Sequence, residues 1–278
     1  MDDHSPDLIL RGASAPFAAP AGCHALTVTE VQHYTDRLFR FRVTRPASFR
    51  FRSGEFVMIG LPNAERPVMR AYSIASPAWD DTLEFYSIKV PDGPLTEHLQ
   101  QIREGDTLLM RQKATGTLVL DALRPGKRLW MLSTGTGIAP FASLIRDPET
   151  YERFDQVFLL HGCREVAELA YGAEITEATR HDPLVGDLAH DRLRLVNSAT
   201  REDYPVRRRI TDLITSGDIC DMLGVPPMAA GDDRVMICGS IAMLADCKAI
   251  CLSAGLTEGA NNRPAEFVVE KAFVGDGV

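Results

Sequence analysis

The sequence lacks the features that mark membrane and nucleic-acid-binding proteins. No apolar run among its 278 residues approaches the roughly 18 that a membrane-spanning helix requires, so no membrane insertion is expected. Its 30 basic and 38 acidic residues give a formal charge of -8, which argues against the basic face that a phosphate-backbone binder needs. With 45% hydrophobic and 24% charged residues, the composition is that of an ordinary soluble globular protein.

The cysteines also lack the spacing of a metal or iron–sulfur site. No Cys-x-x-Cys pair and no Cys-x4-Cys-x2-Cys pattern of a plant-type cluster is present. Cys247 and Cys251 lie one helical turn apart, but without a nearby second pair they are expected to be core thiols. We therefore expect no metal site, and six free thiols in a reducing, cytoplasmic compartment: Cys23, Cys163, Cys220, Cys238, Cys247 and Cys251.

Length and periodicity predict two domains after a short tail, because domains average about 100 to 200 residues. Residues 1–24 start acidic and lack the basic start and apolar centre of a secretory signal, so they are expected to form a flexible tail. Residues 25–126 contain short strands with regular turn signals, typical of an antiparallel barrel or sandwich. Residues 127–278 alternate apolar strands, glycine turns and helices, which predicts a parallel α/β sheet.

The expected elements follow from these patterns. In the first domain, strands are expected within 26–43, 51–60, 70–73, 83–90, 108–111 and 116–120, with a short helix beginning near residue 95 or 96. In the second, strands are expected at 128–134, 156–161, 193–196, 234–238 and 266–270, with helices over 141–145, about 166–178 and 240–253.

The stretch Arg70-Ala-Tyr-Ser73 contains the residue types that a flavin nucleotide needs. Successive side chains of a strand face opposite ways, so Arg70 and Tyr72 should share one face and Ser73 the other. A guanidinium suits phosphate, an aromatic ring can stack on an isoalloxazine, and a hydroxyl can donate to a ring nitrogen. An isolated R-x-Y-S is also typical of an ordinary half-buried strand whose arginine pairs with a carboxylate.

A glycine turn and short helix follow the next strand. Gly93-Pro-Leu-Thr96 leads into this helix, whose start offers free amide donors and a positive dipole end. This turn is therefore a candidate seat for a pyrophosphate.

The second domain has its own glycine turn directly after its first strand. Ser133-Thr-Gly-Thr-Gly-Ile-Ala-Pro140 is not G-x-G-x-x-G, because Pro140 takes the third glycine position, and a lone Gly-x-Gly is common. Ligands of parallel sheets lie beyond the carboxyl ends of the strands, and this position favours a dinucleotide site.

Several arginines follow later strands at the same expected edge. Arg164 follows the second strand, and Thr200 and Arg201 follow the third, close to Arg207-Arg-Arg209. Such a cluster can distinguish a 2′-phosphate from a ribose hydroxyl, although single surface arginines are usually solvated. Cys238-Gly-Ser240, after the fourth strand, is the remaining candidate; it is equally typical of a buried thiol at a strand end.

Together, these motifs resemble the ferredoxin (flavodoxin)–NADP reductase family, in particular its bacterial branch, from about Leu26 to Val278. The resemblance implies an N-terminal antiparallel β-barrel that binds FAD and a C-terminal α/β parallel-sheet domain that binds NADP. The FAD contacts that it implies are Arg70, Ala71, Tyr72, Ser73, Tyr86, Ser87, Ile88, Lys89, Gly93, Pro94, Leu95, Thr96, Thr136, Ala272, Phe273 and Val274. The NADP contacts are Thr134, Gly135, Gly137, Arg164, Thr200, Arg201, Arg209, Cys238, Gly239 and Ser240.

The resemblance also implies roles near the reacting atoms. Tyr72, Ser73, Cys238, Glu270 and Ala272 are the expected catalytic residues: Cys238 beside the nicotinamide, and Glu270 matching a family carboxylate near the flavin. Plant-type members end in an aromatic residue that covers the flavin. This sequence instead has Ala272 there and continues to Val278, which is typical of one bacterial subclass, and its tail is expected to return to the flavin.

The implied activity is electron transfer between NADPH and ferredoxin or flavodoxin, because a flavin links two-electron and one-electron chemistry. A reductase component of an oxygenase system, or an FAD-binding electron-transfer or regulatory subunit of a larger complex, remains an alternative. The missing iron–sulfur cysteines count against the known subunits of the last kind. The expected protein is a monomer.

Overall fold

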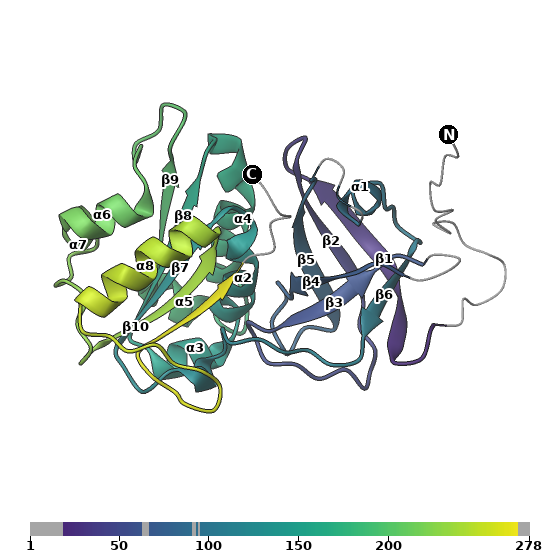
Figure 1. Cartoon of the computed structure of the whole chain (residues 1–278), viewed down its shortest axis with the longest axis horizontal. Helices are drawn as coiled ribbons and strands as arrows, with labels where there is room; N and C mark the ends of the chain where they lie inside the picture. The colour runs from purple at the N-terminus through teal and green to yellow at the C-terminus, as the bar shows by residue number, and fades with distance from the viewer. Residues whose placement is uncertain (1–18, 63–66, 91–92, 94, 272–278) are drawn as a thin grey trace.

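A computed structural model of the chain describes residues 19–62, 67–90, 93 and 95–271. Figure 1 shows a barrel of early strands beside a sheet of later strands with helices packed around it. In the expected tail, residues 1–18 lie outside the described residues, and the first strand begins at Cys23. No described helix is both long and apolar enough to span a bilayer.

The first half is a nearly closed antiparallel barrel, as expected. Its strands lie in the order β4-β3-β6-β1-β2-β5. Alternate side chains of β2, including Phe39, Phe41 and Val43, fill the barrel interior, as the two-residue period of a strand requires. Its elements are β1 (Cys23–His33), β2 (Leu38–Thr44), β3 (Phe56–Gly60), β4 (Met69–Ser73), β5 (Thr82–Ile88), α1 (Thr96–Leu99) and β6 (Thr107–Arg111).

The second half is a parallel sheet, again as expected, with the order β11-β10-β7-β8-β9. The chain runs from β7 outward to β9, then returns to β10 on the other side of β7. The strand order therefore reverses between β7 and β10, and open α/β sheets bind ligands at such a point. The strands are β7 (Arg128–Thr134), β8 (Gln156–Cys163), β9 (Leu193–Ala199), β10 (Asp233–Gly239) and β11 (Phe267–Lys271).

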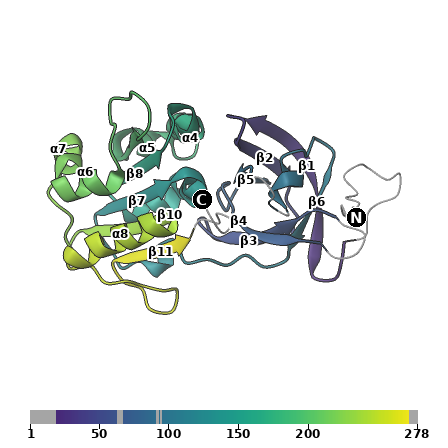
Figure 2. The same ribbon diagram turned by 45° about the horizontal axis from the view of Figure 1, so that its top comes forward.

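Helices cover both faces of this sheet because alternate residues of β7 point to opposite sides. Leu129 and Met131 pack into the core shared with α2 to α5, whereas Trp130 and Leu132 pack into the core shared with α6 to α8. Figure 2 shows α4 and α5 on the other side of the sheet from α8. The helices are α2 (Ala139–Ile145), α3 (Pro148–Arg153), α4 (Ala170–Arg180), α5 (Gly186–Arg192), α6 (Ile210–Ser216), α7 (Asp218–Leu223) and α8 (Ile241–Ser253).

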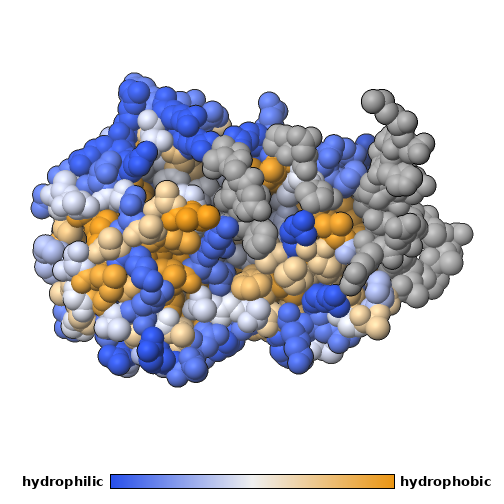
Figure 3. All heavy atoms as spheres, in the orientation of Figure 1, coloured by the Kyte–Doolittle hydropathy of each residue, from blue (hydrophilic) through white to orange (hydrophobic). Residues whose placement is uncertain are grey.

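Short 3₁₀ turns complete the described elements: Leu120–Ala122, Gly135–Ile138 and Val166–Leu169. On α8, Ile241 and Leu252 are exposed apolar side chains. Figure 3 shows apolar patches interrupted by hydrophilic residues on this face of the molecule.

The prediction of a strand over residues 116–120 is wrong. The Thr117 amide donates to the Glu270 carboxylate at 3.0 Å, and the Thr117 hydroxyl donates to the Val269 carbonyl at 2.9 Å. The segment therefore bonds to β11 of the second half and does not form a regular strand of the barrel. It connects the two halves. The sequence reading also missed α3, α5, α6 and α7, each of only six or seven residues.

Candidate functional site

A cavity of about 310 Å³ lies where the barrel meets the first turn of the second half. The open edge between β4 and β5 forms one wall, and Thr136 and Ala139 reach it from the other half. Glu270, the expected carboxylate beside the flavin, lines this cavity. Eleven of the sixteen residues expected to contact FAD also line it: Arg70, Ala71, Tyr72, Ser73, Tyr86, Ser87, Ile88, Gly93, Leu95, Thr96 and Thr136.

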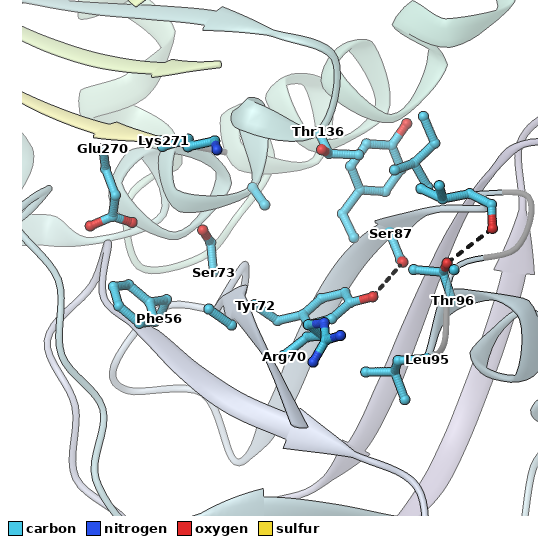
Figure 4. Close-up of a pocket in the computed structure, with 16 residues that line it drawn as sticks. Phe56, Arg70, Tyr72, Ser73, Ser87, Leu95, Thr96, Thr136, Glu270 and Lys271 are labelled. Atoms are coloured by element: carbon cyan, nitrogen blue, oxygen red, sulfur yellow. Dashed lines mark hydrogen bonds between the residues drawn. The ribbon is translucent and has the colours of Figure 1, made fainter. Parts of the chain in front are cut away.

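The side chains of β4 alternate as expected. Figure 4 shows Arg70 and Tyr72 on the side of Leu95 and Thr96, whereas Ser73 lies on the side of Phe56 and Glu270. An arginine, an aromatic ring and a hydroxyl therefore enter one cavity from a single short strand.

Tyr72 is held by the strand across the cavity. Its hydroxyl lies 3.1 Å from the Ser87 hydroxyl of β5, so this contact bridges the open edge of the barrel. Burial raises the pKa of Tyr72 to about 12, although the Ser87 hydrogen bond and the charge of Arg70 oppose the shift. The phenol is therefore neutral at physiological pH and presents an uncharged ring.

Within the described residues, most donors of the Arg70 guanidinium are free for a ligand. Its Nη1 donates to the Met69 carbonyl at 3.0 Å, and no described carboxylate pairs with it. The described residues therefore do not form the alternative arrangement, in which this arginine pairs with a carboxylate. A planar fork with free donors suits a phosphate.

The turn before α1 is tightly packed. A Cβ at Gly93 would lie 2.1 Å from the Thr96 hydroxyl, so this position has no room for a side chain. The Thr96 hydroxyl donates to the Val90 carbonyl at 3.2 Å. Pro94 lies outside the described residues, and Lys89 does not line the cavity.

Glu270 is the second-last residue of β11 and lies at the wall of the first cavity. Burial raises its pKa to about 7, opposed by hydrogen bonds from Thr117 and increased by the charge of Glu55. A carboxyl group with this pKa can hold or release a proton near neutral pH.

Cys238 lies beside Glu270 on the neighbouring strand, as its paired residue in the sheet. It is buried, and both burial and the nearby Glu270 raise the pKa of its thiol well above the usual range. Cys238 lines neither cavity and carries a protonated thiol at neutral pH. Ala272, Phe273 and Val274 lie outside the described residues.

A second cavity, of about 440 Å³, lies at the carboxyl ends of the parallel strands. It shares Ile88, Val90 and Thr136 with the first, so the two cavities adjoin at these residues. Seven of the expected NADP contacts line it: Thr134, Gly135, Arg164, Thr200, Arg201, Arg209 and Ser240.

The other expected NADP contacts lie behind this wall. A Cβ at Gly137 would lie 2.3 Å from the Cys238 carbonyl oxygen, and one at Gly239 would lie 2.4 Å from the Thr134 hydroxyl. The turns after β7 and β10 therefore pack directly on each other at the reversal of strand order. Gly137 and Gly239 make this contact without lining the cavity.

The arginines gather at one end of the second cavity because two loops are bonded together. The Arg201 amide donates to the Arg164 carbonyl at 2.9 Å, and the Thr200 amide donates to the Cys163 carbonyl at 3.1 Å. Within the described residues, the guanidinium groups of Arg164, Arg201 and Arg209 form no ion pair. They are thus available to an anionic ligand.

Other residues of both cavities escaped the sequence reading. Phe56, Val90, Ala139 and Lys271 line the first cavity, and Arg37, Glu168, Thr211 and Asp246 line the second. Lys271 directly follows Glu270, which is a signal that could have been used. Arg37 lies between β1 and β2, far from the motifs in sequence, and had no such signal.

The residues of the two cavities fit the two nucleotides. Free arginine donors, a neutral aromatic ring and hydroxyl groups suit a flavin nucleotide, and unpaired arginines beside a glycine turn suit a phosphorylated dinucleotide. No described cluster of His, Cys, Asp and Glu is arranged to hold a metal ion.

Known proteins share both halves of the chain. The model of the oxidoreductase FAD-binding domain matches residues 24–118, and that of the oxidoreductase NAD-binding domain matches residues 131–249. A flavodoxin/ferredoxin–NADP reductase of Rhodobacter capsulatus is 59% identical, covering 91% of this chain and 94% of that protein. A ferredoxin–NADP reductase of Pseudomonas aeruginosa is 50% identical, covering 89% of this chain and 96% of that protein.

A solved structure agrees with these relatives. The ferredoxin NADP+ reductase from Neisseria gonorrhoeae, with bound FAD and NADP, matches with a TM-score of 0.82 and 32% sequence identity. The match covers 91% of this chain and 100% of that one. Sequence, fold and cavities therefore agree. The chain belongs to the ferredoxin–NADP reductase family.

Proposed function

We propose that this protein is a ferredoxin/flavodoxin–NADP reductase that uses bound FAD to pass electrons between NADPH and a one-electron carrier. The observation that carries the proposal is that the two cavities adjoin, with Ile88, Val90 and Thr136 in the walls of both. Hydride exchange between two bound nucleotides requires their reacting atoms to be in contact, and adjoining cavities would bring the two nucleotides together. Bound FAD would supply the link between two-electron and one-electron chemistry.

In this proposal each group in the first cavity has a role. Arg70 binds phosphate, Tyr72 stacks on the flavin, and Ser73 donates a hydrogen bond to it. Glu270 holds a proton close to the flavin. Residues 25–126 form the FAD-binding domain, and 127–278 the NADP-binding domain, with the C-terminal tail returning to the flavin.

The second cavity should favour NADPH over NADH. Arg201, Arg164 and Arg209 would bind the 2′-phosphate together with Thr200, because their guanidinium groups are unpaired in the described residues. Each hydrogen bond to a charged group contributes about 1.5 to 3 kcal/mol, so two such bonds give a large preference.

The carrier should be a small acidic ferredoxin or flavodoxin. The chain has a formal charge of -8, but basic residues line both cavities. Arg70 and Lys271 line the first cavity, which we call the flavin-type cavity, and Arg37 lines the second. Local positive charge at the cavities would attract an acidic partner and speed the encounter. We further propose that the protein works as a monomer in the cytoplasm.

The test is carrier-dependent electron transfer by the purified protein. With FAD bound, NADPH should reduce cytochrome c only when ferredoxin or flavodoxin is added, and NADH should be a poor substitute. The flavin released on denaturation should be FAD. Release of FMN alone, or no carrier-dependent reduction with either class of carrier, would contradict the proposal.

A further inference from the structure

A buried carboxylate joins the two halves of the molecule outside both cavities. Leu83 and Phe85 of β5 point into the barrel, so Glu84 and Tyr86 point outward, toward the second half. Glu84 is only 1% exposed. Such a charge requires close partners to remain ionised.

Glu84 has partners from both halves. From β2, Arg40 Nη1 donates to it at 3.1 Å and Arg42 Nε at 3.0 Å. From the second half, the Tyr171 hydroxyl donates to it at 2.8 Å and Arg146 Nη2 at 3.2 Å. Burial opposes ionisation of Glu84, but the charges of Arg146, Arg40 and Arg42 outweigh it and lower its pKa to about 2.

Of the two partners from the second half, Arg146 is connected to the glycine turn after β7, which we call the nucleotide turn. Arg146 directly follows α2, and α2 directly follows the turn Gly135–Ile138. Arg146 also donates to the Ala75 carbonyl of the barrel at 2.5 Å.

Tyr171 is connected to the flavin-type cavity. It lies in the first turn of α4, and its ring stacks on Tyr86 with 4.2 Å between ring centroids and 15° between planes. Tyr86 lines the first cavity together with Thr136 of the nucleotide turn. Glu84 therefore bonds to Arg146, which follows the helix whose residue Ala139 lines this cavity. It also bonds to Tyr171, which stacks on a residue of the cavity wall.

We propose that Glu84 is a positioning residue: by bonding to Arg146 and Tyr171 across the boundary, it sets the separation between the nucleotide turn and the flavin-type cavity. This inference rests on the proposed function. Hydride transfer from NADPH to the flavin moves one hydrogen with two electrons over a short contact. A misplacement of about 1 Å can slow such a step by about 100-fold.

Glu84→Gln keeps the size of the side chain and removes its charge. We expect hydride transfer, followed by stopped-flow reduction of the flavin, to slow by about 10- to 100-fold. The dissociation constant for NADP+ and the FAD content should change by less than about 3-fold, since no residue that lines the arginine-rich end is altered. Hydrogen exchange across 139–145 and 170–180, measured without NADPH, should increase.

Two further variants separate positioning from stability. Tyr171→Phe removes one bond across the boundary but keeps the stacked ring, and should slow hydride transfer in the same direction with a smaller change. Arg42→Gln removes a partner on the barrel side alone. It should lower the thermal midpoint with little effect on hydride transfer, and it serves as the control.

Unchanged hydride transfer in folded Tyr171→Phe and Glu84→Gln, with only a lower thermal midpoint, would overturn the inference. If Glu84→Gln does not fold, the comparison of Tyr171→Phe with Arg42→Gln decides alone. Failure of the unaltered protein to accept hydride from NADPH would instead contradict the proposed function.

Discussion

Burial decides what the carboxyl group of Glu270 can do. Its pKa is raised to about 7, whereas the pKa of Glu84, another buried glutamate but surrounded by arginines, is lowered to about 2. The same side chain thus serves as a proton-holding group at one end of the interface and as a fixed charge at the other. Burial alone would raise both pKa values, so the charged neighbours of each carboxyl group make this difference.

Glu270→Gln should change how stability depends on pH. The folded protein holds the Glu270 proton more tightly than the unfolded chain, whose ordinary pKa is 4.5. This contribution is fully present below pH 4.5 and is lost as pH rises through about 7, amounting to roughly 3 kcal/mol. In Glu270→Gln, the loss of unfolding free energy between pH 5 and pH 8 should therefore be smaller by a comparable amount, as measured by urea denaturation. Equal slopes in the two proteins would show that Glu270 titrates normally.

Sequence and structure agree best on residues that lie within one short motif. Arg70, Tyr72 and Ser73 enter one cavity because a single strand carries all three. Glu84 was not recognised, because its partners come from β2, the end of α2 and the start of α4. No local pattern marks such a meeting of distant segments.

Among the elements, the turn after β7 shows how close packing depends on glycine. Gly137 approaches the Cys238 carbonyl so closely that any side chain must displace backbone. A flexible side chain could move aside, but two packed turns cannot do so without shifting the cavity wall. The spacing of glycines in 133–140 thus reflects contact with the turn after β10 as well as any contact with a ligand.

Gly137→Ala should therefore weaken both folding and nucleotide binding. The added Cβ would lie 2.3 Å from the Cys238 oxygen, and such overpacking typically costs about 1 to 3 kcal/mol. We expect a lower free energy of unfolding and a higher dissociation constant for NADP+, measured by calorimetric titration. Gly231→Ala is a matched control, because a Cβ there meets no atom within 4 Å. Similar effects in both variants would exclude the steric explanation.

The length of an element decided whether the sequence could predict it. The apolar run of β7 was predicted at its observed bounds, because a fully buried strand reads as continuous hydrophobic sequence. Helices of six or seven residues span fewer than two full turns, so α5 and α6 show no clear helical period. The start of α3 did carry a signal, Asp147 followed by Pro148, which the reading passed over.

At the scale of the whole molecule, the edge strand of one half ends at the cavity of the other. β11 is the last strand in the sheet order, beside β10, and its final residues, Glu270 and Lys271, line the flavin-type cavity. The expectation that Ala272 to Val278 return to the flavin concerns residues outside the described ones and stays a prediction.

Deletion of residues 272–278 should weaken FAD retention and ease nicotinamide access. These residues are expected to cover part of the flavin, so their removal would expose flavin surface to water and favour release of the flavin. We expect a higher dissociation constant for FAD, measured by fluorescence of the released flavin, and a shifted flavin absorption spectrum. The Michaelis constant for NADPH should fall, because a competitor for the flavin face is removed.

A shorter deletion, of residues 275–278, separates the parts of this tail. It keeps Ala272, Phe273 and Val274, the expected FAD contacts, and should retain FAD as tightly as the full chain. If the longer deletion also left FAD affinity, absorption spectrum and kinetics unchanged, the tail would not contact the flavin.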